Sequence, residues 1–410
     1  MAKIDDSVKK KVPELRFPGF TDDWEERKLG ELTTSFSGGT PSAGNSSYYK
    51  GDIPFIRSGE INSDKTELFL TEAGLKSSSA KMVSVGDILY ALYGATSGEV
   101  GISQINGAIN QAILAIKPCD GYNSHFLMQW LKLKKQKIID QYLQGGQGNL
   151  SGSIVKNLVL KVPNFEEQKK IGAFFKQLDD TITLHQRKLD LLKEQKKGFL
   201  QKMFPKNGAK VPELRFAGFA DDWEERKLKD VTERVRSNDG RMDLPTLTMS
   251  ASSGWLDQKD RFSGDISGKE KKNYTLLKKG ELSYNHGNSK LAKYGVVFSL
   301  TNYEEALVPR VYHSFKALEN TSADFIEYMF STKLPDRELG KLISSGARMD
   351  GLLNINYDDF MNIHISIPNY EEQILVSAFF RKLDETIALH QRKLDLLKEQ
   401  KKGFLQKMFV

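Results

Sequence analysis

Acidic and basic residues stand close together near the start of each half of the chain. Asp22-Asp23 precede Glu26-Arg27-Lys28, and Asp221-Asp222 precede Glu225-Arg226-Lys227. A Glu-x-Lys pair with a further carboxylate is the composition of a metal-dependent nuclease site. Such a site takes its carboxylates from two separate strands, and here they are too close in sequence for that. The pattern therefore predicts a structural helix start at each place.

Glycine-rich segments are a second candidate for chemistry. They occur at Gly94–Gly98 and Gly145–Gly152. Neither segment is a Gly-x-Gly-x-x-Gly fingerprint, and the chain has no Walker sequence. It also lacks the Asn/Asp-Pro-Pro-aromatic tetrapeptide of amino-methyltransferases and the Gly-x-Ser-x-Gly elbow of hydrolases. We interpret both segments as flexible loops that can present backbone to DNA.

Metal ligands are scarce in the sequence. Cys119 is the only cysteine, which excludes an internal disulfide and every cysteine-rich zinc site. The six histidines form neither a His-x-x-x-His nor a His-Glu-x-x-His pair. We therefore expect no metal and no cofactor in this chain. Packing is the favoured role for His185 and His390, which fall on the helix seam described below.

The composition is that of a soluble protein with room for two or more domains, since 39% of the 410 residues are hydrophobic and 28% are charged. No apolar run resembles a signal peptide or a membrane span, so we expect a cytoplasmic protein without membrane contact. The formal net charge is +7, and His185–Phe204 alone carries +4. That charge suits either a solvated helix face or contact with phosphates or a protein partner.

Two internal repeats organise the chain. Pro163–Phe204 returns as Pro368–Phe409, and the last twenty residues of the two copies are identical at an offset of 205. The segment VPELRFPGFTDDW, Val12–Trp24, returns as VPELRFAGFADDW, Val211–Trp223, at an offset of 199. The material between the repeated blocks therefore differs in length by six residues between the two halves.

Each copy of the longer repeat predicts one long helix, about 164–204 in the first half. Asn164 is a candidate N-cap, and Glu167 stands at the capping-box position. Apolar residues then follow heptad spacing. We expect a helix–helix seam formed by Phe175, Leu178, Ile182, Leu189, Leu192, Phe199, Phe380, Leu383, Ile387, Leu394, Leu397 and Phe404.

One such helix alone would expose its seam to water, so the two copies are expected to pack on each other. Antiparallel packing needs only short connections, whereas parallel packing would force the linker after Phe204 to run back along the whole helix. We therefore expect a two-helix antiparallel coiled coil of roughly 60 Å with one variable domain at each end. Val410 would then lie near Val12, which gives a circular, pseudo-twofold arrangement.

The repeats divide the chain into five parts: 1–33, 34–161, 162–232, 233–366 and 367–410. The two variable regions, 34–161 and 233–366, are of domain size and of mixed α/β pattern. Strands are predicted at Ile53–Ile56, Asp87–Tyr90, Ala112–Ile116, Leu158–Val162, Leu282–Tyr284, Val296–Leu300, Leu307–Tyr312 and Ile363–Ile367. Helices are predicted at Phe126–Tyr142 and Phe325–Leu342.

The repeated blocks, VPELRF-x-GF-x-DDWEERKL and Pro-Asn-aromatic-Glu-Glu-Gln leading into the helix, resemble those of specificity subunits of type I restriction-modification systems. The resemblance covers nearly the whole chain. In the first variable region Gly38–Pro41, Gly51–Pro54 and Asn110-Gln111 add to it. In the second, Ser250–Trp255, Tyr284-Asn285 and Gly346–Arg348 look like target-recognition domains of another subtype.

The resemblance implies a non-catalytic, sequence-specific DNA-binding subunit. Each variable region would be a target-recognition domain that reads one half of a bipartite, asymmetric site in double-stranded DNA. The helices would set the spacing and dock two copies of the methyltransferase subunit, and motor-nuclease subunits would join that core. S-adenosylmethionine, ATP and Mg²⁺ would bind those partners.

Readout of bases needs side chains in the grooves, and phosphates are held by Lys, Ser and backbone amides. From residue type and loop position we predict DNA contacts by Arg57, Ser58, Tyr93, Gln147 and Asn149 in the first region. In the second region we predict contacts by Ser250, Ser252, Asn285, His286, Asn288, Lys290 and Arg348.

Two other classes of function remain open at this point. One is a coiled-coil scaffold whose end domains bind protein or carbohydrate. Its binding would lack the steep salt dependence and the sequence preference of a DNA reader. The other is a stand-alone enzyme, which the missing motifs disfavour.

Overall fold

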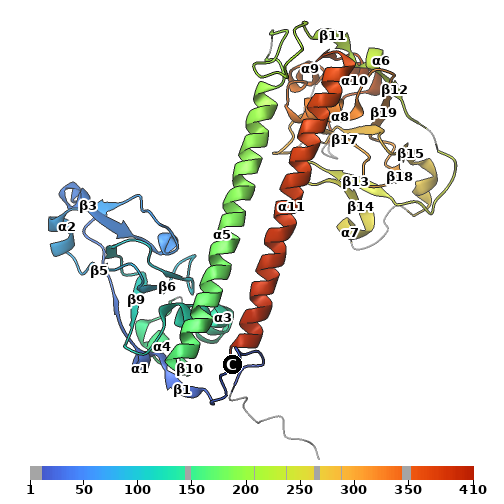
Figure 1. Cartoon of the computed structure of the whole chain (residues 1–410). Coiled ribbons are helices and arrows are strands. Elements are labelled where there is room, and N and C mark those ends of the chain that lie inside the picture. Colours follow the sequence, from blue (N-terminus) through green and yellow to red (C-terminus); the bar gives the residue numbers. More distant parts are fainter. Residues whose placement is uncertain are drawn as a thin grey trace, which may run out of the picture. The chain divides into compact units, whose positions relative to one another are not determined.

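The computed structural model describes residues 12–143, 149–206, 208–236, 238–262, 268–287, 289–343 and 352–410. The chain divides into two compact units (Figure 1). Unit 1 comprises Met1–Arg187 and Arg392–Val410, and unit 2 comprises Lys188–Gln391. Each of the two long helices therefore contributes one segment to each unit. Within the described ranges, no helix is both long enough and apolar enough to cross a bilayer.

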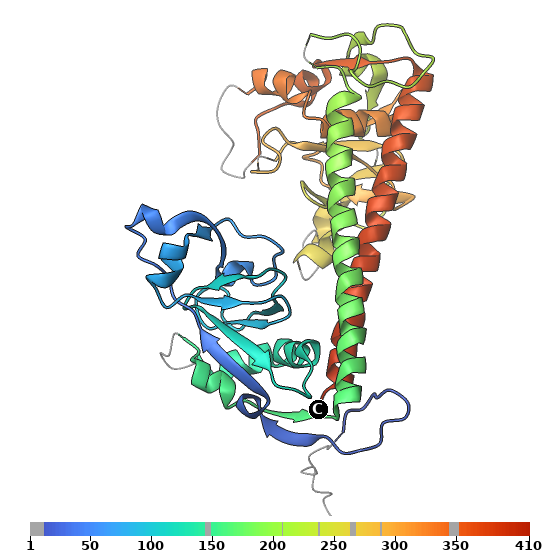
Figure 2. The same ribbon diagram turned by 60° about the vertical axis from the view of Figure 1, so that its left-hand side comes forward.

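The elements of the first half are β1 Glu25–Lys28, α1 Leu29–Leu32, β2 Thr33–Ser37, η1 Ser46–Tyr48, β3 Tyr49–Ile56, η2 Ser58–Glu60, β4 Phe69–Leu70, α2 Glu72–Lys76, β5 Lys81–Val83, β6 Ile88–Ala91, β7 Val100–Ile102, β8 Gly107–Ile109, β9 Ile113–Pro118, α3 Ser124–Tyr142, α4 Gly152–Lys156, β10 Val159–Val162 and α5 Phe165–Lys202. Here η denotes a 3₁₀-helix. One sheet, wholly antiparallel, has the order β2-β9-β6-β7, and a second, in which β3 and β8 are parallel, has the order β4-β3-β8-β5. In Figure 2 these strands can be followed in blue to blue-green.

The elements of the second half are β11 Glu224–Lys227, α6 Leu228–Val231, β12 Thr232–Arg234, β13 Leu247–Ser250, β14 Gly254–Asp257, α7 Gln258–Phe262, η3 Gly268–Asn273, β15 Thr275–Lys278, β16 Leu282–Asn285, β17 Val296–Ser299, β18 Glu305–Val308, β19 His313–Ala317, α8 Ala323–Ser331, α9 Asp336–Lys341, α10 Tyr357–Met361, β20 His364–Ile367 and α11 Tyr370–Met408. The sheet β12-β19-β16-β17 repeats the strand order of the first four-stranded sheet of unit 1. Both units are therefore mixed α/β structures built on the same sheet.

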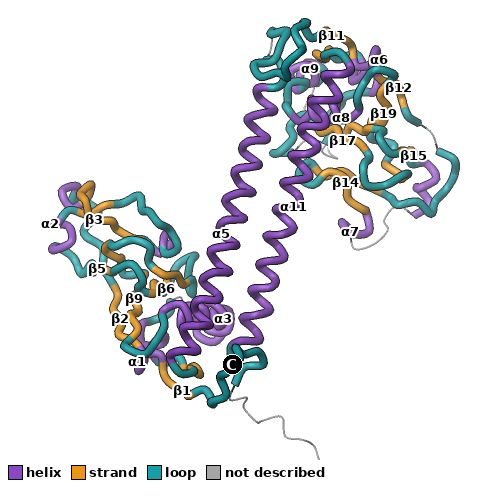
Figure 3. The backbone as a smooth tube through the Cα atoms, viewed as in Figure 1, coloured by secondary structure: helices purple, strands orange, loops and turns teal. Residues whose placement is uncertain are grey.

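The long helices α5 and α11 are uninterrupted (Figure 3). The predicted cap is confirmed, because Asn164 Oδ1 accepts a hydrogen bond from the Glu167 amide at 3.0 Å. Asn369 does the same for the Glu372 amide. These caps satisfy one of the amides that every helix start leaves without a partner inside the helix.

The side chain of Glu167 has a different role from the predicted capping box. Its two carboxylate oxygens accept hydrogen bonds from Nε and Nη2 of Arg16, at 2.7 and 2.8 Å. The Glu167 side chain is fully buried, and that of Arg16 is 13% exposed. Arg215 and Glu372 form the same bidentate pair in unit 2. The two repeated blocks are thus joined by one buried ion pair in each unit.

The end of one long helix completes the core of each unit. In unit 1, Phe409 packs on Trp24, Phe126 and Phe175. The Leu15 amide also donates to the Lys407 carbonyl at 2.8 Å. In unit 2, Phe204 takes the same position between Trp223, Phe325 and Phe380. The expected proximity of the C-terminal helix end to the first repeat is therefore present within unit 1.

Within each unit the two helix segments run antiparallel. In unit 1, Phe174 contacts Phe404 and Asp179 pairs with Lys401 at 2.6 Å. In unit 2, Phe199 contacts Phe379 and Lys196 pairs with Asp384 at 2.6 Å. All twelve predicted seam residues are buried or half-buried. The burial accords with a seam, and its continuity along both helices stays a prediction.

The predicted strands and the first predicted helix coincide with observed elements within a few residues, with one exception. Leu307–Tyr312 is not one strand, because Pro309 ends β18 and the Tyr312 amide closes a turn onto the Pro309 carbonyl. The predicted helix Phe325–Leu342 is also wrong. It is broken into α8 and α9, with Lys333 at a φ of 67° and Pro335 ahead of α9. Proline lacks the amide that would continue the first helix.

The prediction of a helix start at Glu26-Arg27-Lys28 is corrected as well. Glu25–Lys28 is strand β1, paired antiparallel with β10, and β11 pairs with β20 in the same way. The short helix α1 begins only at Leu29. The four charged residues of β1 suit an exposed strand, because all of them face water. No three His, Cys, Asp or Glu residues of the described ranges are close enough to hold a metal ion.

Breaking the buried pair should destabilise unit 1 strongly. We expect Arg16→Met to lower the free energy of unfolding by about 3–5 kcal/mol, because Glu167 is left as a buried, uncompensated charge. The measurement is urea denaturation. Arg27→Ala is the control, since Arg27 and Glu25 form an exposed pair, and it should cost under about 1 kcal/mol. The double variant Arg16→Met with Glu167→Met should recover most of the loss; a double variant as unstable as the single one would contradict this account.

Candidate nucleic-acid interface

Three loops meet at one edge of the antiparallel sheet in unit 1. Ser37 at the end of β2 pairs with Leu114 near the start of β9, and Ala91 at the end of β6 pairs with Ile113. The end of β2, the end of β6 and the start of β9 therefore lie at the same edge of the sheet. We call the segments that follow or precede them, Gly38–Pro41, Leu92–Gly98 and Asn110–Ala112, together with Asn149–Ser151, the loop edge of unit 1.

Hydrogen bonds hold this loop edge together. Leu92 donates its amide to Ala112 and accepts one from Leu150, at 2.8 and 2.9 Å. Tyr93 and Asn149 form an isolated antiparallel bridge. Two of the predicted DNA contacts, 56 residues apart in the chain, are thus neighbours. Gln147 lies outside the described residues.

The Gly38-Gly39 pair explains how the first loop fits. A Cβ at Gly38 would lie 1.8 Å from the Ile109 carbonyl oxygen, and one at Gly39 would lie 2.0 Å from Oγ of Ser79. Only glycine lets the backbone approach β8 this closely, and the Gly39 amide bonds Ile109 there. Thr40 then donates to Gln111 at 2.5 Å, which links two loops of the edge.

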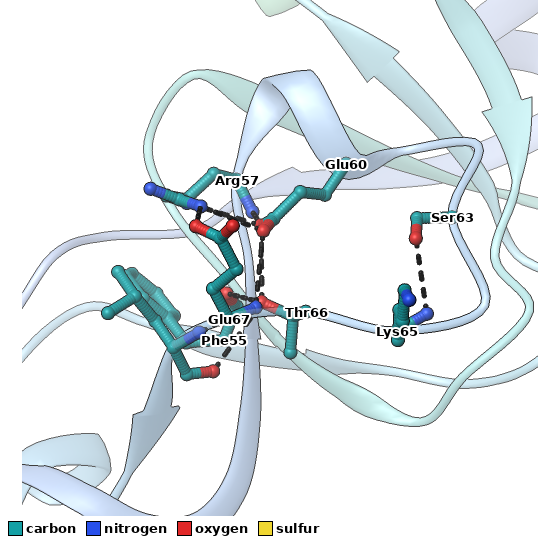
Figure 4. A network of polar contacts seen from close by, with 8 residues as sticks. Phe55, Arg57, Glu60, Ser63, Lys65, Thr66 and Glu67 are labelled. Atoms are coloured by element: carbon teal, nitrogen blue, oxygen red, sulfur yellow. Dashed lines mark hydrogen bonds and ion pairs between the residues drawn. The ribbon is translucent and has the colours of Figure 1, made fainter. Parts of the chain in front are cut away.

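Arg57 and Ser58 belong to a further segment, at the start of η2 after β3. Ile56, the last residue of β3, pairs in parallel with Ile109, so Arg57 follows β3 beside Asn110 of the loop edge. Figure 4 shows the Arg57 guanidinium between two carboxylates, with Nη2 2.8 Å from Glu60 and 2.9 Å from Glu67. Burial raises the pKa of Glu60, but hydrogen bonds from the Arg57 side chain and from the Arg57 and Glu67 amides outweigh it and lower that pKa to about 2. A base contact by Arg57 would have to displace these carboxylates.

Unit 2 has an equivalent loop edge. Arg234 at the end of β12 pairs with Phe315 of β19, and Tyr284 near the end of β16 pairs with His313. The loop edge of unit 2 comprises Val235–Arg236, Asn285–Gly287, Pro309–Tyr312 and Leu352–Asn356. Gly287 and Leu352 form the isolated bridge that corresponds to Tyr93 and Asn149 in unit 1.

The described contact candidates of unit 2 gather around this edge. Asn285 accepts from the Gly287 amide at 3.0 Å and approaches the Met249 carbonyl at 3.5 Å. That contact brings the β13–β14 turn, with Ser250 and Ser252, next to the edge; their hydroxyls are 3.1 Å apart. Lys290 is exposed. Asn288 and Arg348 lie outside the described residues.

His286 is the predicted contact whose position fits worst, because its side chain is only 4% exposed. Its Nδ1 lies 3.3 Å from the Ile355 carbonyl oxygen, which also accepts a hydrogen bond from Nε2 of His313 at 2.9 Å. Burial, together with the positive charges of His286 and Arg236, lowers the pKa of His313 to about 4. Both rings are therefore packed under the loop edge rather than presented on it.

Sequence reasoning missed three arginines of this edge. Arg234, Arg236 and Arg310 line a pocket of about 340 Å³ together with His313 and Tyr357. The Arg234 guanidinium carbon lies 3.9 Å from the centre of the Tyr357 ring. The available signal was Arg-Val-Arg at 234–236, shortly after the second copy of the block that ends at Leu228. Strand register brings Arg310 to Arg234, and hydrogen bonds of Leu353 and Ile355 to His286 and His313 bring Tyr357 of α10 to the same place.

The histidine pair makes the stability of unit 2 sensitive to acid. The folded-state pKa of His313, about 4, is below its ordinary value of 6.5. Its contribution is therefore present above pH 6.5 and is lost as the pH falls towards 4. At pH 5 we expect a loss of about 2 kcal/mol in the free energy of unfolding relative to pH 8. His313→Gln should remove this loss, and His364→Gln, at an exposed position, should keep it; equal pH profiles for both variants would contradict the assignment.

The chain matches known proteins along most of its length. The family model for the type I restriction modification DNA specificity domain matches residues 21–194 and 220–399. The MjaVIII type I restriction enzyme specificity subunit of Methanocaldococcus jannaschii is 20% identical over 412 residues, which is 97% of this chain and 93% of that protein. The MjaIX specificity subunit of the same organism is 29% identical over 183 residues, 42% of this chain and 41% of that protein.

Solved structures show the same fold. The S subunit of a type I restriction-modification system from M. genitalium aligns with a TM-score of 0.63 at 13% identity, covering 97% of this chain and 99% of the other. A chain from a study of complex assembly and conformational transition of the type I R-M system aligns with a TM-score of 0.50 at 15% identity. At such low identity these likenesses concern the fold alone. The sequence match spans both halves, and the chain belongs to the family of type I restriction-modification DNA specificity subunits.

Proposed function

We propose that this chain gives a type I restriction-modification complex its DNA sequence specificity, with units 1 and 2 each reading one half of a bipartite, asymmetric site. The observation that carries the proposal is the recurrence of one loop edge in both units with different side chains. The same strand ends and the same bridge position the loops. The backbone that positions the loops is equivalent in the two units, whereas the side chains on the loops differ. Such a pair of surfaces is suited to binding two different DNA sequences.

The differences between the edges are chemical. At an offset of 199, Ser35 corresponds to Arg234, Gln111 to Arg310 and Leu114 to His313. The edge of unit 1 presents neutral polar groups such as Gln111 and Asn149. Amide side chains suit adenine, and guanidinium groups suit guanine or phosphate. The two units would therefore recognise different bases.

In this proposal α5 and α11 form one antiparallel coiled coil that spaces the two readers. The antiparallel contacts within each unit support it, as do the Asp179–Lys401 and Asp384–Lys196 pairs at equivalent positions. At 1.5 Å per residue, the 38 residues of α5 extend over roughly 57 Å. A helix of that length exceeds one turn of DNA, about 34–36 Å, which suits a target with a gap between its halves.

Partner subunits would dock on the helices. Two leucines of the repeated helix are exposed in both copies: Leu184 and Leu396 lie in unit 1, and Leu389 and Leu191 lie in unit 2, with exposed fractions of 51–67%. A repeated apolar pair favours binding of the same partner twice. The partner would be the methyltransferase subunit, in two copies, joined by motor-nuclease subunits. Catalysis, S-adenosylmethionine, ATP and Mg²⁺ would belong to those partners.

The test of specificity is to co-purify the chain with the methyltransferase encoded beside it and to map the adenines that become methylated. We expect one asymmetric sequence in two parts with an unread gap. Replacing residues 233–366 with the corresponding region of a relative should change one part and leave the other unchanged. Methylation of an undivided sequence, or a change in both parts, would count against two separate readers.

Docking is tested by the exposed leucines. Leu184→Gln with Leu396→Gln should reduce the bound methyltransferase from two copies to one, because each leucine buried in an interface contributes about 1.5–3 kcal/mol. Leu191→Gln with Leu389→Gln should do the same at unit 2. The stoichiometry is measured by native mass spectrometry. Met82→Gln, an exposed apolar residue of β5, serves as the control; full occupancy in all the variants would refute docking at these leucines.

A further inference from the structure

Three arginines at the unit 2 loop edge have no carboxylate partner within the part of the chain that the structure describes. Among the described residues, no ion pair involves Arg234, Arg236 or Arg310, and all three are exposed. Four other arginines of unit 2 are paired: Arg215 with Glu372, Arg226 with Glu224, Arg241 with Asp239 and Glu305, and Arg381 with Asp324. Three unpaired cations around one pocket leave a local excess of positive charge.

Strand pairing brings the three arginines together from two parts of the chain. Arg234 ends β12, and the Val235 amide donates to the Ser314 carbonyl of β19 at 3.0 Å, which places Arg236 beside that strand. Arg310 belongs to the turn that leads into β19. All three line the same pocket of about 340 Å³.

Tyr357 forms an aromatic wall of this pocket. The Arg234 guanidinium stacks on its ring at 3.9 Å, and stacking restrains the guanidinium while leaving its N–H groups free to donate. The Tyr357 hydroxyl is buried and has no hydrogen-bond partner among the described residues. Burial raises the pKa of Tyr357, and Asp358 raises it further, so the hydroxyl remains a donor at neutral pH. A phosphate oxygen would supply the acceptor that it lacks.

Unit 1 does not have this arrangement. Ser35, Ser37 and Gln111 correspond to Arg234, Arg236 and Arg310 at the offset of 199, and Gly152 corresponds to Tyr357 at the offset of 205. A Cβ at Gly152 would lie 3.2 Å from the Leu114 side chain, and glycine itself has no ring on which a guanidinium could stack. The arginines and the tyrosine of this pocket are therefore found in unit 2 and are not repeated at the equivalent positions of unit 1.

We propose that Arg234, Arg236, Arg310 and Tyr357 form a clamp for the DNA backbone, binding a phosphodiester group in the half of the site that unit 2 recognises. The proposal rests on the proposed function and adds which chemistry of the DNA this pocket takes. Three converging cations match a phosphate, which carries no base identity. Unit 2 would therefore have a source of sequence-independent affinity that the equivalent positions of unit 1, Ser35, Ser37, Gln111 and Gly152, do not repeat.

The experiment uses the full chain in complex with its methyltransferase subunits. Dissociation constants are measured by fluorescence anisotropy at several salt concentrations, on a duplex with the mapped target and on one without it. The variants are Arg234→Gln, Arg236→Gln and Arg310→Gln. Arg241→Gln is the matched control, since Arg241 is exposed in the same unit but paired with Asp239 and Glu305.

Each clamp variant should weaken binding to both duplexes by the same factor, about tenfold. A variant that carries all three changes should also reduce the slope of log Kd against log salt by about 0.9, because the one phosphate contact is lost, and each single variant should reduce it by a smaller amount. The methylated sequence should stay unchanged, and Arg234→Lys should keep most of the slope. Arg241→Gln should match the wild type.

Two results would overturn the clamp. Loss of affinity on the target duplex alone, or relaxed methylation at one base pair, would make these arginines base readers. Clamp variants that behave like Arg241→Gln would show that the pocket does not contact DNA. A wild-type complex that binds both duplexes equally would instead refute the proposed function, and the salt slopes on either duplex would still decide the clamp.

Discussion

The architecture of both units depends on one buried ion pair, Arg16 with Glu167 and Arg215 with Glu372. The partners are 151 and 157 residues apart, so each pair closes a whole variable region between its two ends. A buried carboxylate without its guanidinium is costly, which makes any arrangement that separates the repeated blocks unfavourable. The pair also sits at the capped start of a long helix. The opening segment, the helix start and the variable region are therefore held in one geometry.

Neutral hydrogen bonds extend this frame to the variable sheets. Gln168 accepts from the Asn123 amide at 3.1 Å and donates to the Pro163 carbonyl at 2.8 Å. Gln373 does the same with Ser322 and Pro368. These contacts position α3 and α8, which pack on the four-stranded sheets. These hydrogen bonds join side chains of the repeated blocks to backbone atoms, some of them in the variable regions. The side chains of the loops at the sheet edge can therefore differ without breaking them. This separation of frame and surface is the physical basis for two unlike readers in one chain.

The loop edges show how far the two surfaces have diverged. The loop edge of unit 1 contains a turn with two glycines, Gly38 and Gly39, and neutral side chains such as Thr40 and Gln111. Unit 2 places arginines over an aromatic ring and keeps two histidines beneath them, with His313 neutral because burial opposes its charge. Arg57, an arginine in a loop of unit 1, is instead paired with two glutamates. Charge at a DNA-facing surface therefore depends on which arginines lack carboxylate neighbours, and sequence composition does not report that.

The two repeats, the long helices with the cap at Asn164, and most strands could be predicted from the amino-acid sequence, because repetition, capping and apolar periodicity are visible in the chain itself. The remaining features depend on contacts between distant segments. Glu167 bonds Arg16 rather than its own helix, Pro335 interrupts a helix that apolar spacing alone had favoured, and the charged residues of β1 belong to a strand because β10 lies beside them. Tyr93 with Asn149, and Arg234 with Arg310, became neighbours through antiparallel register, and Tyr357 joined them because the segment before α10 bonds to His286 and His313. Such register is set by contacts between distant segments, and no local pattern in the chain encodes it.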